Sequence, residues 1–200
     1  MFETVINRGA LEPPKIREFA VDDAHTALLF GLLVSAKPLD IFEMGVGTGH
    51  TSNVILDAIA YNGRGKLTCV DNWFDWWHSN PGQEPPVAQK IRDRGATIVV
   101  QTEEEWTRSA PTDSADFILS DCDHVGANKY LDETMRVLRP GGLILFHDIC
   151  NVTYPGLCEF PKRLAHLNPI VFSTSTRADE SCYRGIMLVK NAKPTPSRQE

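Results

Sequence analysis

Two pairs of ionisable side chains each follow an apolar run that could form a strand. Asp121 and His124 follow one such run, and His147 with Asp148 follows another. Neighbouring parallel strands lie about 4.8 Å apart, so we expect these four side chains to face one crevice. Carboxylates and imidazoles around one point suit proton transfer, or the binding of a divalent cation that supplies opposing charge. The pattern therefore predicts a reactive centre at two strand ends.

A glycine-rich turn forms a second candidate site. Gly45, Gly47 and Gly49 follow another apolar run that contains Glu43. Glycines there let the backbone turn sharply and approach a ligand, and the next helix start offers unpaired N–H groups, although such a turn can also serve packing alone. We expect Glu43 to face a cationic or hydrogen-bond-donating ligand group. Asp71, at the end of the next run, is placed to accept from the hydroxyls of a ribose.

The elements that would position these residues alternate along the chain. Apolar runs predict strands at 39–44, 66–70, 97–100, 117–120 and 143–146, and helical spacing predicts helices at 21–35, 48–60, 87–94, 129–138 and 160–167. This alternation is typical of an α/β, doubly wound fold, whose mostly parallel sheet has helices on both faces. Two late runs, 170–173 and 185–189, predict an antiparallel pair at one sheet edge, which makes seven strands.

Length and composition favour one domain. The chain has 200 residues, of which 42% are hydrophobic and 23% charged, enough for a single core and unlike disordered or collagen-like chains. We expect an N-terminal arm or lid over 1–20, the folded domain over 21–190 and a flexible tail over 191–200. The irregular run 149–156, which contains Tyr154, leaves the fifth strand and is expected to overlie a substrate.

Charge and cysteine content narrow the functional class. The net charge of −6 argues against a broad nucleic-acid surface. No apolar stretch approaches the roughly 20 residues that a membrane helix needs, and the N-terminus lacks the order of a signal peptide. The five cysteines show no C-x-x-C spacing, so we expect free thiols rather than a zinc or redox site. A soluble, cytoplasmic protein is the resulting expectation.

The glycine turn and the acid after the second strand resemble those of class I S-adenosylmethionine (SAM)-dependent methyltransferases. The first motif of that family is an acidic residue followed by G-x-G-x-G, matched by Glu43, Gly45, Gly47 and Gly49, and its ribose acid is matched by Asp71. The resemblance extends from about residue 22 to 190. It implies the Rossmann-like methyltransferase fold, with SAM as cofactor.

The resemblance also assigns further residues to the cofactor. Asn72 and Trp73 are expected to line the adenosine pocket, and Asp121 is assigned to the cofactor side as well. The turn after the third strand is expected to lie beside the adenine. For the glutamates at 103–105, which follow that turn, we expect a solvated helix start rather than a ligand role.

The two later strand ends look like those of metal-dependent small-molecule O-methyltransferases, namely the caffeoyl-CoA type and the macrolide-sugar and cephalosporin-hydroxylase-like group. In that comparison Asp121, His147 and Asp148 match metal ligands, and His124, with an unperturbed pKa near 6.5, matches the general base. These families usually carry a carboxylate at the position of His147. Since Mg²⁺ prefers oxygen ligands, manganese, iron or no metal stay open. His147 could instead hydrogen-bond at the crevice rim, and His124 could cap the next helix.

The resemblance thus implies an enzyme, a SAM-dependent methyltransferase that acts on a hydroxyl oxygen of a small molecule, with Mg²⁺ or Mn²⁺ as an optional cofactor. Three alternatives stay open: N-methylation of a macromolecule, a non-catalytic SAM-binding partner subunit, and an NAD-dependent oxidoreductase, which Glu43 and His50 disfavour. The expected partner is a small acceptor molecule, with no membrane and no nucleic acid. A homodimer is left open.

Overall fold

The computed structural model describes residues 21, 23–73, 84–121, 123–149, 154–174 and 184–192. The expected N-terminal arm, 1–20, lies outside the described residues. The chain divides into two compact units, Met1–Thr102 and Glu103–Glu200. Among the helices described, none combines the length and apolar character that crossing a membrane requires.

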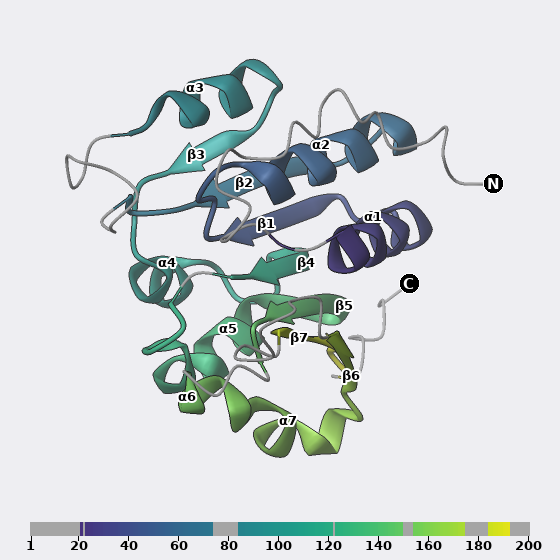
Figure 1. Cartoon of the computed structure of the whole chain (residues 1–200), viewed down its shortest axis with the longest axis vertical. Coiled ribbons are helices and arrows are strands. Elements are labelled where there is room, and N and C mark those ends of the chain that lie inside the picture. The colour runs from purple at the N-terminus through teal and green to yellow at the C-terminus, as the bar shows by residue number, and fades with distance from the viewer. Residues whose placement is uncertain are drawn as a thin grey trace, which may run out of the picture. The chain divides into compact units, whose positions relative to one another are not determined.

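The first unit is a three-stranded parallel sheet with helices between its strands. Its elements are α1 (Asp23–Ala36), β1 (Asp40–Met44), α2 (His50–Asn62), β2 (Lys66–Val70), α3 (Pro86–Asp93) and β3 (Thr97–Val99). The strand order is β3-β2-β1, and Met44 pairs with Val70 at the carboxyl ends of β1 and β2 (Figure 1). Ile41 and Leu67 are buried because strands covered on both faces need apolar side chains throughout. The carboxyl ends of β1 and β2 therefore lie side by side in this unit, and a loop follows each of them.

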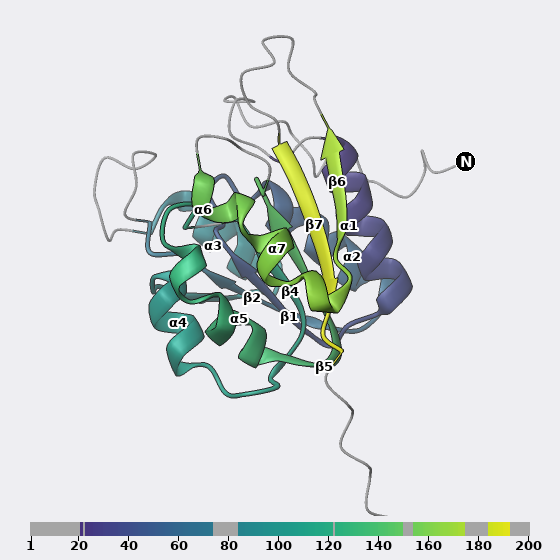
Figure 2. The same cartoon turned by 90° about the horizontal axis from the view of Figure 1, so that it is seen from below.

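The second unit combines a parallel strand pair with an antiparallel edge. Its elements are α4 (Glu103–Ser109), β4 (Ala115–Ser120), the 3-10 helix η2 (Ala127–Lys129), α5 (Leu131–Val137), β5 (Leu138–His147), α6 (Pro155–Cys158), α7 (Phe160–Arg163), the 3-10 helix η3 (Ala165–Leu167), β6 (Ile170–Thr174) and β7 (Arg184–Lys190). The order is β4-β5-β7-β6, with β4 and β5 parallel and β7 antiparallel to both of its neighbours. Figure 2 shows β6 beside β7. The predicted antiparallel edge pair is confirmed.

The fifth strand starts earlier than predicted. We expected a helix to residue 138, a turn at 140–142 and a strand at 143–146, whereas β5 begins at Leu138, directly after α5. Gly141 has a φ of 80°, and its N–H donates to Asn191 O at 2.8 Å, while Asn191 N donates to Gly142 O at 2.9 Å. These bonds extend the pairing of β5 beyond the end of β7. Asn191 is consequently buried, so the expected tail over 191–200 does not begin at 191, and 193–200 lie outside the described residues.

Aromatic packing holds the segment of short helices against the sheet of the second unit. Phe160 of α7 is fully buried and meets Phe146 of β5 edge to face, with ring centroids 5.0 Å apart. Such pairs add about 0.5–1.5 kcal/mol beyond the area they bury. This contact places the helices that follow β5 close to its carboxyl end.

Candidate functional site

The glycine turn after β1 needs glycine for two separate reasons. Gly45, Gly47 and Gly49 all have positive φ values, 92°, 49° and 77°, which residues with a Cβ rarely adopt. At Gly49, an added Cβ would also lie 2.6 Å from Val87 Cγ2 and 2.9 Å from Ile91 Cδ1 of α3. The backbone of the turn is thus shaped by local conformation and by the close approach of α3.

Asp71 holds this turn from the end of β2. Its Oδ2 accepts hydrogen bonds from the N–H groups of Val46, at 2.8 Å, and Gly47, at 3.2 Å. Its Oδ1 accepts from the N–H of Trp73 at 2.8 Å. An ionised carboxylate offers roughly four acceptor sites, so these three bonds are compatible with one further donor such as a ribose hydroxyl. The residue that was expected to bind ribose therefore also fixes the glycine turn.

Glu43 faces the protein interior, contrary to the expectation that it faces a ligand group. Its carboxylate is fully buried and accepts from the hydroxyls of Thr51 and Ser52, in the first turn of α2, and from the thiol of Cys69 at 3.3 Å. The reason is that α2 starts directly over β1 and presents two hydroxyls to it. Burial and then the charge of Glu43 raise the pKa of the Cys69 thiol far above its usual range, so this thiol stays protonated.

Asn72 and Trp73, the residues expected beside the adenosine, follow Asp71 in the loop that leaves β2. Asn72 is half-buried, whereas Trp73 is only 1% exposed and has a φ of 52°. A bulky residue in this left-handed region is strained and persists only where its surroundings determine it. The glycines, Asp71, Asn72 and Trp73 all lie in the first unit, on the loops after β1 and β2.

The second candidate site is a cluster of acids and histidines after β4 and β5. Ser120 pairs with Phe146 in these parallel strands, so the next residues, Asp121 and His147, come out side by side. Nδ1 of His147 lies 2.9 Å from Oδ1 of Asp121. Asp148 follows in a left-handed conformation, with a φ of 57°, which aspartate tolerates better than most residues.

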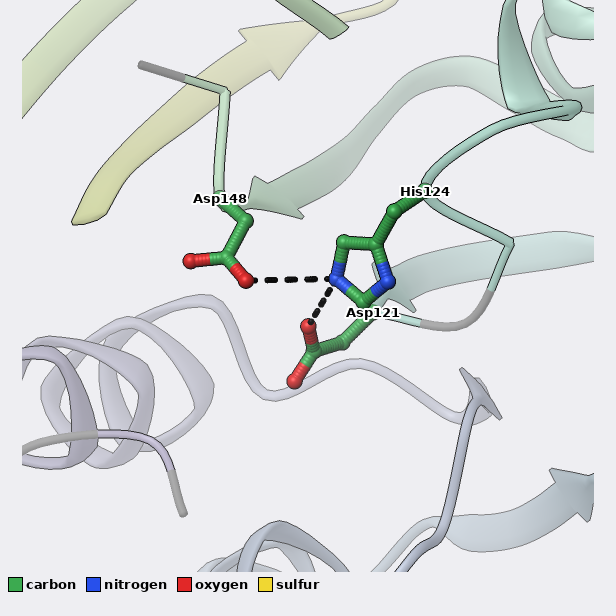
Figure 3. A group of neighbouring side chains, drawn as sticks. All are labelled: Asp121, His124 and Asp148. Atoms are coloured by element: carbon green, nitrogen blue, oxygen red, sulfur yellow. Dashed lines mark ion pairs between the residues drawn. The ribbon is translucent and has the colours of Figure 1, made fainter. Parts of the chain in front are cut away.

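His124 completes the cluster from the loop after β4. Its Nε2 lies 3.2 Å from Oδ2 of Asp148 and 3.5 Å from Oδ1 of Asp121, and Figure 3 shows one nitrogen of the imidazole facing both carboxylates. One ligand atom from each of these three residues lies within 4.8 Å of the others, a set that could hold a metal ion. The four residues expected to converge do converge, since Nδ1 of His147 also lies 2.9 Å from Oδ1 of Asp121 and 3.6 Å from Oδ1 of Asp148. Which of the two imidazoles serves as a metal ligand stays a prediction.

The carboxylates change the proton affinity of this cluster. Burial acts to raise the pKa of Asp121, but the charge of His147 and the hydrogen bonds of His124 and His147 outweigh it and hold that pKa well below its usual range. Burial acts to lower the pKa of His124, but Asp121 and Asp148 outweigh it and raise that pKa to about 10. The value near 6.5 expected for His124 therefore does not hold beside these two carboxylates, and His124 carries a proton at neutral pH.

Residues that follow β5 contact both His124 and the helices after its loop. Tyr154 stacks on the imidazole of His124, with ring centroids 4.6 Å apart and an interplanar angle of 27°. Arg163 of α7 donates to Oδ1 of Asn128 at 2.8 Å and to Oδ1 of Asp132 at 2.9 Å. Tyr154 thus lies on the cluster, within the run 149–156 that was expected to overlie the substrate.

Glu103 is buried, which makes the prediction of a solvated helix start wrong for this residue. It is 2% exposed and accepts from the hydroxyls of Ser120, at 2.8 Å, and Tyr130, at 3.1 Å, and from the N–H of Asp123 at 3.1 Å. Burial raises the pKa of Glu103 to about 6, although these hydrogen bonds act in the opposite direction. The sequence carries no signal that separates Glu103 from the two glutamates after it.

Comparison with solved structures identifies the fold. The O-methyltransferase TomG from Streptomyces achromogenes, in complex with SAM, matches with a TM-score of 0.64 and 16% identity, over 92% of this chain and 88% of that chain. An O-methyltransferase from Bacillus cereus, in complex with S-adenosylhomocysteine (SAH), gives 0.65 and 14% over 92% and 89%. SAH-bound PaMTH1 from Podospora anserina, a methyltransferase, gives 0.64 and 11% over 93% and 86%. The predicted α/β methyltransferase fold is confirmed.

Comparison at the sequence level identifies the family. None of the curated proteins compared with this chain matches it. A family model described as a methyltransferase domain matches residues 42–149, which is more than half of the chain. The matched range includes the glycine turn, Asp71 and the whole acid–histidine cluster. The chain therefore belongs to the methyltransferase-domain family.

Proposed function

We propose that the protein transfers a methyl group from SAM to a hydroxyl oxygen of a small molecule. The main support is the glycine turn held by Asp71, which lies inside the residues matched by the methyltransferase family model. The solved O-methyltransferases of similar fold were determined with SAM or SAH. This proposal extends to the present chain what is known of those proteins.

The first unit holds the residues proposed to bind the cofactor. The turn over 45–49 brings bare backbone toward a ligand, and Asp71 has acceptor capacity left for a ribose hydroxyl. Asn72 and Trp73 are proposed to line the adenosine pocket. When bound, SAM supplies a methyl group attached to a positively charged sulfur. That sulfur is a good leaving group because it departs as a neutral thioether. Glu43 is proposed to support the glycine turn without touching the cofactor, because its hydrogen bonds connect β1 to the start of α2.

The second unit holds the residues proposed to handle the acceptor. Methyl transfer is an in-line displacement that needs an oxygen held close to the methyl carbon and relieved of its proton. His124, Asp121 and Asp148 gather one nitrogen and two carboxylates around a point. His124 is proposed to accept that proton from its neutral form, which requires that it first lose the proton it holds beside the two carboxylates. Asp121 is proposed to serve the acceptor or the cofactor side.

The donor set also fits a divalent cation. Two carboxylates with an imidazole suit Mn²⁺ or Fe²⁺ better than Mg²⁺, which prefers oxygen ligands. We propose that Asp121, Asp148 and one imidazole hold the cation; Nε2 of His124 is close to both carboxylates, whereas Nδ1 of His147 lies 2.9 Å from Asp121 and 3.6 Å from Asp148. A bound cation supplies positive charge that lowers the pKa of a nearby hydroxyl. With a cation beside Asp121 and Asp148, His124 would favour its neutral form.

Turnover by variants tests the proposal. SAM is incubated with a panel of catechols, phenols and sugars, and SAH formation is measured for the wild-type protein and for His124→Ala. We expect His124→Ala to bind SAH normally and to lose at least about 100-fold in turnover, the usual range for a group that transfers a proton. Unchanged turnover in this variant would contradict the role of His124. Turnover that does not change when a strong chelator is added would contradict the proposed cation. SAH binding without turnover on any acceptor would favour a non-catalytic partner subunit.

We further propose that the protein is a cytoplasmic homodimer. Its substrates are proposed to be free small molecules rather than nucleic acid. The net charge of −6 disfavours a phosphate backbone as partner. Ile170, Val171 and Phe172 of β6 are 53%, 41% and 38% exposed, and β6 ends the strand order of the second unit. Exposed apolar edge strands favour pairing with another strand. Light scattering that finds a monomer would contradict the dimer.

A further inference from the structure

Glu103 is a buried carboxylate for which the proposed reaction has no direct use. It is the first residue of α4, and it is only 2% exposed. A carboxylate in such a place is costly unless its oxygens accept hydrogen bonds. Its contacts therefore indicate what it is there to hold.

Two of its three hydrogen bonds reach the chain on either side of Asp121. Oε1 accepts from Ser120 Oγ at 2.8 Å, immediately before Asp121, and Oε2 accepts from Asp123 N at 3.1 Å, two residues after it. Oε2 also accepts from Tyr130 Oη at 3.1 Å. Tyr130 precedes α5 and is 1% exposed, so the carboxylate is anchored to the core on its other side.

The loop then folds back on itself through Asp123. Oδ1 of Asp123 accepts from the N–H groups of Val125, at 3.1 Å, and Gly126, at 2.6 Å. His124 lies within this turn, so Glu103 holds the chain at Ser120 and Asp123, and Asp123 in turn holds it at Val125 and Gly126. Asp121 and His124 project from between the two holding points.

Resting on the proposed role of Asp121 and His124 in handling the acceptor, we propose that Glu103 is the positioning residue of the 120–126 loop. Its carboxylate bonds the residues on both sides of Asp121 and thereby sets where the carboxylate of Asp121 and the imidazole of His124 lie. Outer residues that orient ligands in this way typically change metal affinity by about 10–100-fold when they are replaced.

Replacing Glu103 with glutamine or with alanine is expected to affect its hydrogen bonds differently. In Glu103→Gln the amide oxygen can accept from Asp123 N and Tyr130 Oη, while the amide N–H₂ donates to the Ser120 hydroxyl, so all three contacts survive. In Glu103→Ala the N–H of Asp123 loses its acceptor and the loop loses its anchor. Glu104→Ala is the matched control, because Glu104 is the next residue, is 46% exposed and pairs only with Arg108 among the ion pairs described.

The experiment follows the ring of His124 by NMR in histidine-labelled full-length protein at one fixed pH. The signal is assigned among the six histidines by its absence in His124→Gln. Stacking on Tyr154 shifts the ring protons of His124 through the ring current. We expect Glu103→Gln and Glu104→Ala to keep the wild-type position, Glu103→Ala to lose the stacking shift, and Tyr130→Phe to move part of the way. Tyr130→Phe carries the test if Glu103→Ala does not fold.

Mn²⁺ and SAH titrations of the same proteins complete the test. We expect Glu103→Ala to bind Mn²⁺ at least about tenfold more weakly, with Glu103→Gln close to wild type and SAH affinity unchanged throughout. If folded Glu103→Ala keeps the wild-type His124 signal, the positioning role is wrong; loss of SAH affinity with that signal unchanged would place Glu103 on the cofactor side instead. A wild-type protein that binds no Mn²⁺ would contradict the proposed cation site, while the His124 signal would still decide the role of Glu103.

Discussion

Single buried or half-buried acidic residues in this protein hold neighbouring segments of the chain together. Asp71 accepts from three backbone N–H groups, and Glu43 accepts from two hydroxyls of α2. Hydrogen bonds to a charged group contribute about 1.5–3 kcal/mol each. These two acids are therefore expected to stabilise the glycine turn and its junction with α2 even before a ligand is bound.

Glu103 gives a pH-dependent stability that can be isolated with one variant. The pKa of its carboxyl rises from the model-peptide value of 4.5 to about 6 in the folded protein, so the folded state holds this proton more tightly than the unfolded chain. The stabilisation from this proton is fully present below pH 4.5 and is lost as the pH rises through 6. The difference between those two pKa values corresponds to about 2 kcal/mol.

We therefore expect the free energy of unfolding of Glu103→Gln, relative to wild type, to increase by about 2 kcal/mol between pH 4.5 and pH 7.5. Urea unfolding at a series of pH values measures this difference. Other titrating groups cancel because they are common to both proteins. A difference that stays constant with pH would show that Glu103 does not have the raised pKa.

At the scale of elements, the start of α2 offers a comparison of two glycines in one turn. Gly49 has a φ of 77°, and an added Cβ would lie 2.6 Å from Val87 Cγ2 of α3; Gly47 has a φ of 49° and nothing within 4 Å of its added Cβ. We expect Gly47→Ala to cost about 1 kcal/mol through backbone strain alone. Gly49→Ala should cost about 2–4 kcal/mol, because overpacking against α3 adds to the strain.

Chemical denaturation of the two variants measures these losses directly. A larger loss for Gly49→Ala supports the view that α3 closes on the turn. Equal losses would mean that α3 moves aside without cost, and that the turn needs glycine for its conformation only.

Strands with continuous apolar runs were predicted well, and irregular junctions were not. The strand predicted at 66–70 coincides with β2, and the late pair at 170–173 and 185–189 corresponds to β6 and β7. The helix predicted at 160–167 is instead divided into α7 and η3, preceded by α6. Pro161 near the start of α7 lacks an N–H, and Asn168 after η3 is left-handed. The early start of β5 reflects the pairing of Leu138 with Ala115 of β4 and the hydrogen bond from Asn191 Nδ2 to Leu138 O at 2.6 Å, two partners that are distant in the sequence and that no local pattern can reveal.

At the scale of the whole molecule, the fold could be predicted because two patterns indicate the same architecture. Predicted strands and helices alternate along the chain, and ionisable residues follow the predicted strands. Parallel pairing of β4 and β5 brings Asp121 beside His147, as strand ends alone suggested. The roles within the cluster could not be predicted in the same way. His124 and His147 each approach both carboxylates, His124 because of the path of the loop after β4, and the burial of Glu103 depends on how α4 packs.

Two comparisons agree that the chain is a methyltransferase. The family model matches residues 42–149, and solved methyltransferases have a similar fold over more than nine-tenths of the chain. They leave the cofactor as the central claim to be tested on this chain itself. The most direct measurement is titration calorimetry of the purified, metal-stripped protein with SAH, with and without added Mn²⁺, and with NAD as the control ligand.

We expect SAH to bind and NAD not to bind. Asp71→Ala should bind SAH at least about tenfold more weakly, since it loses a charged acceptor that contributes about 1.5–3 kcal/mol per hydrogen bond. The absence of SAH binding to the wild-type protein, both with and without Mn²⁺, would contradict the proposed function and would leave the glycine turn as a packing device between β1, α2 and α3.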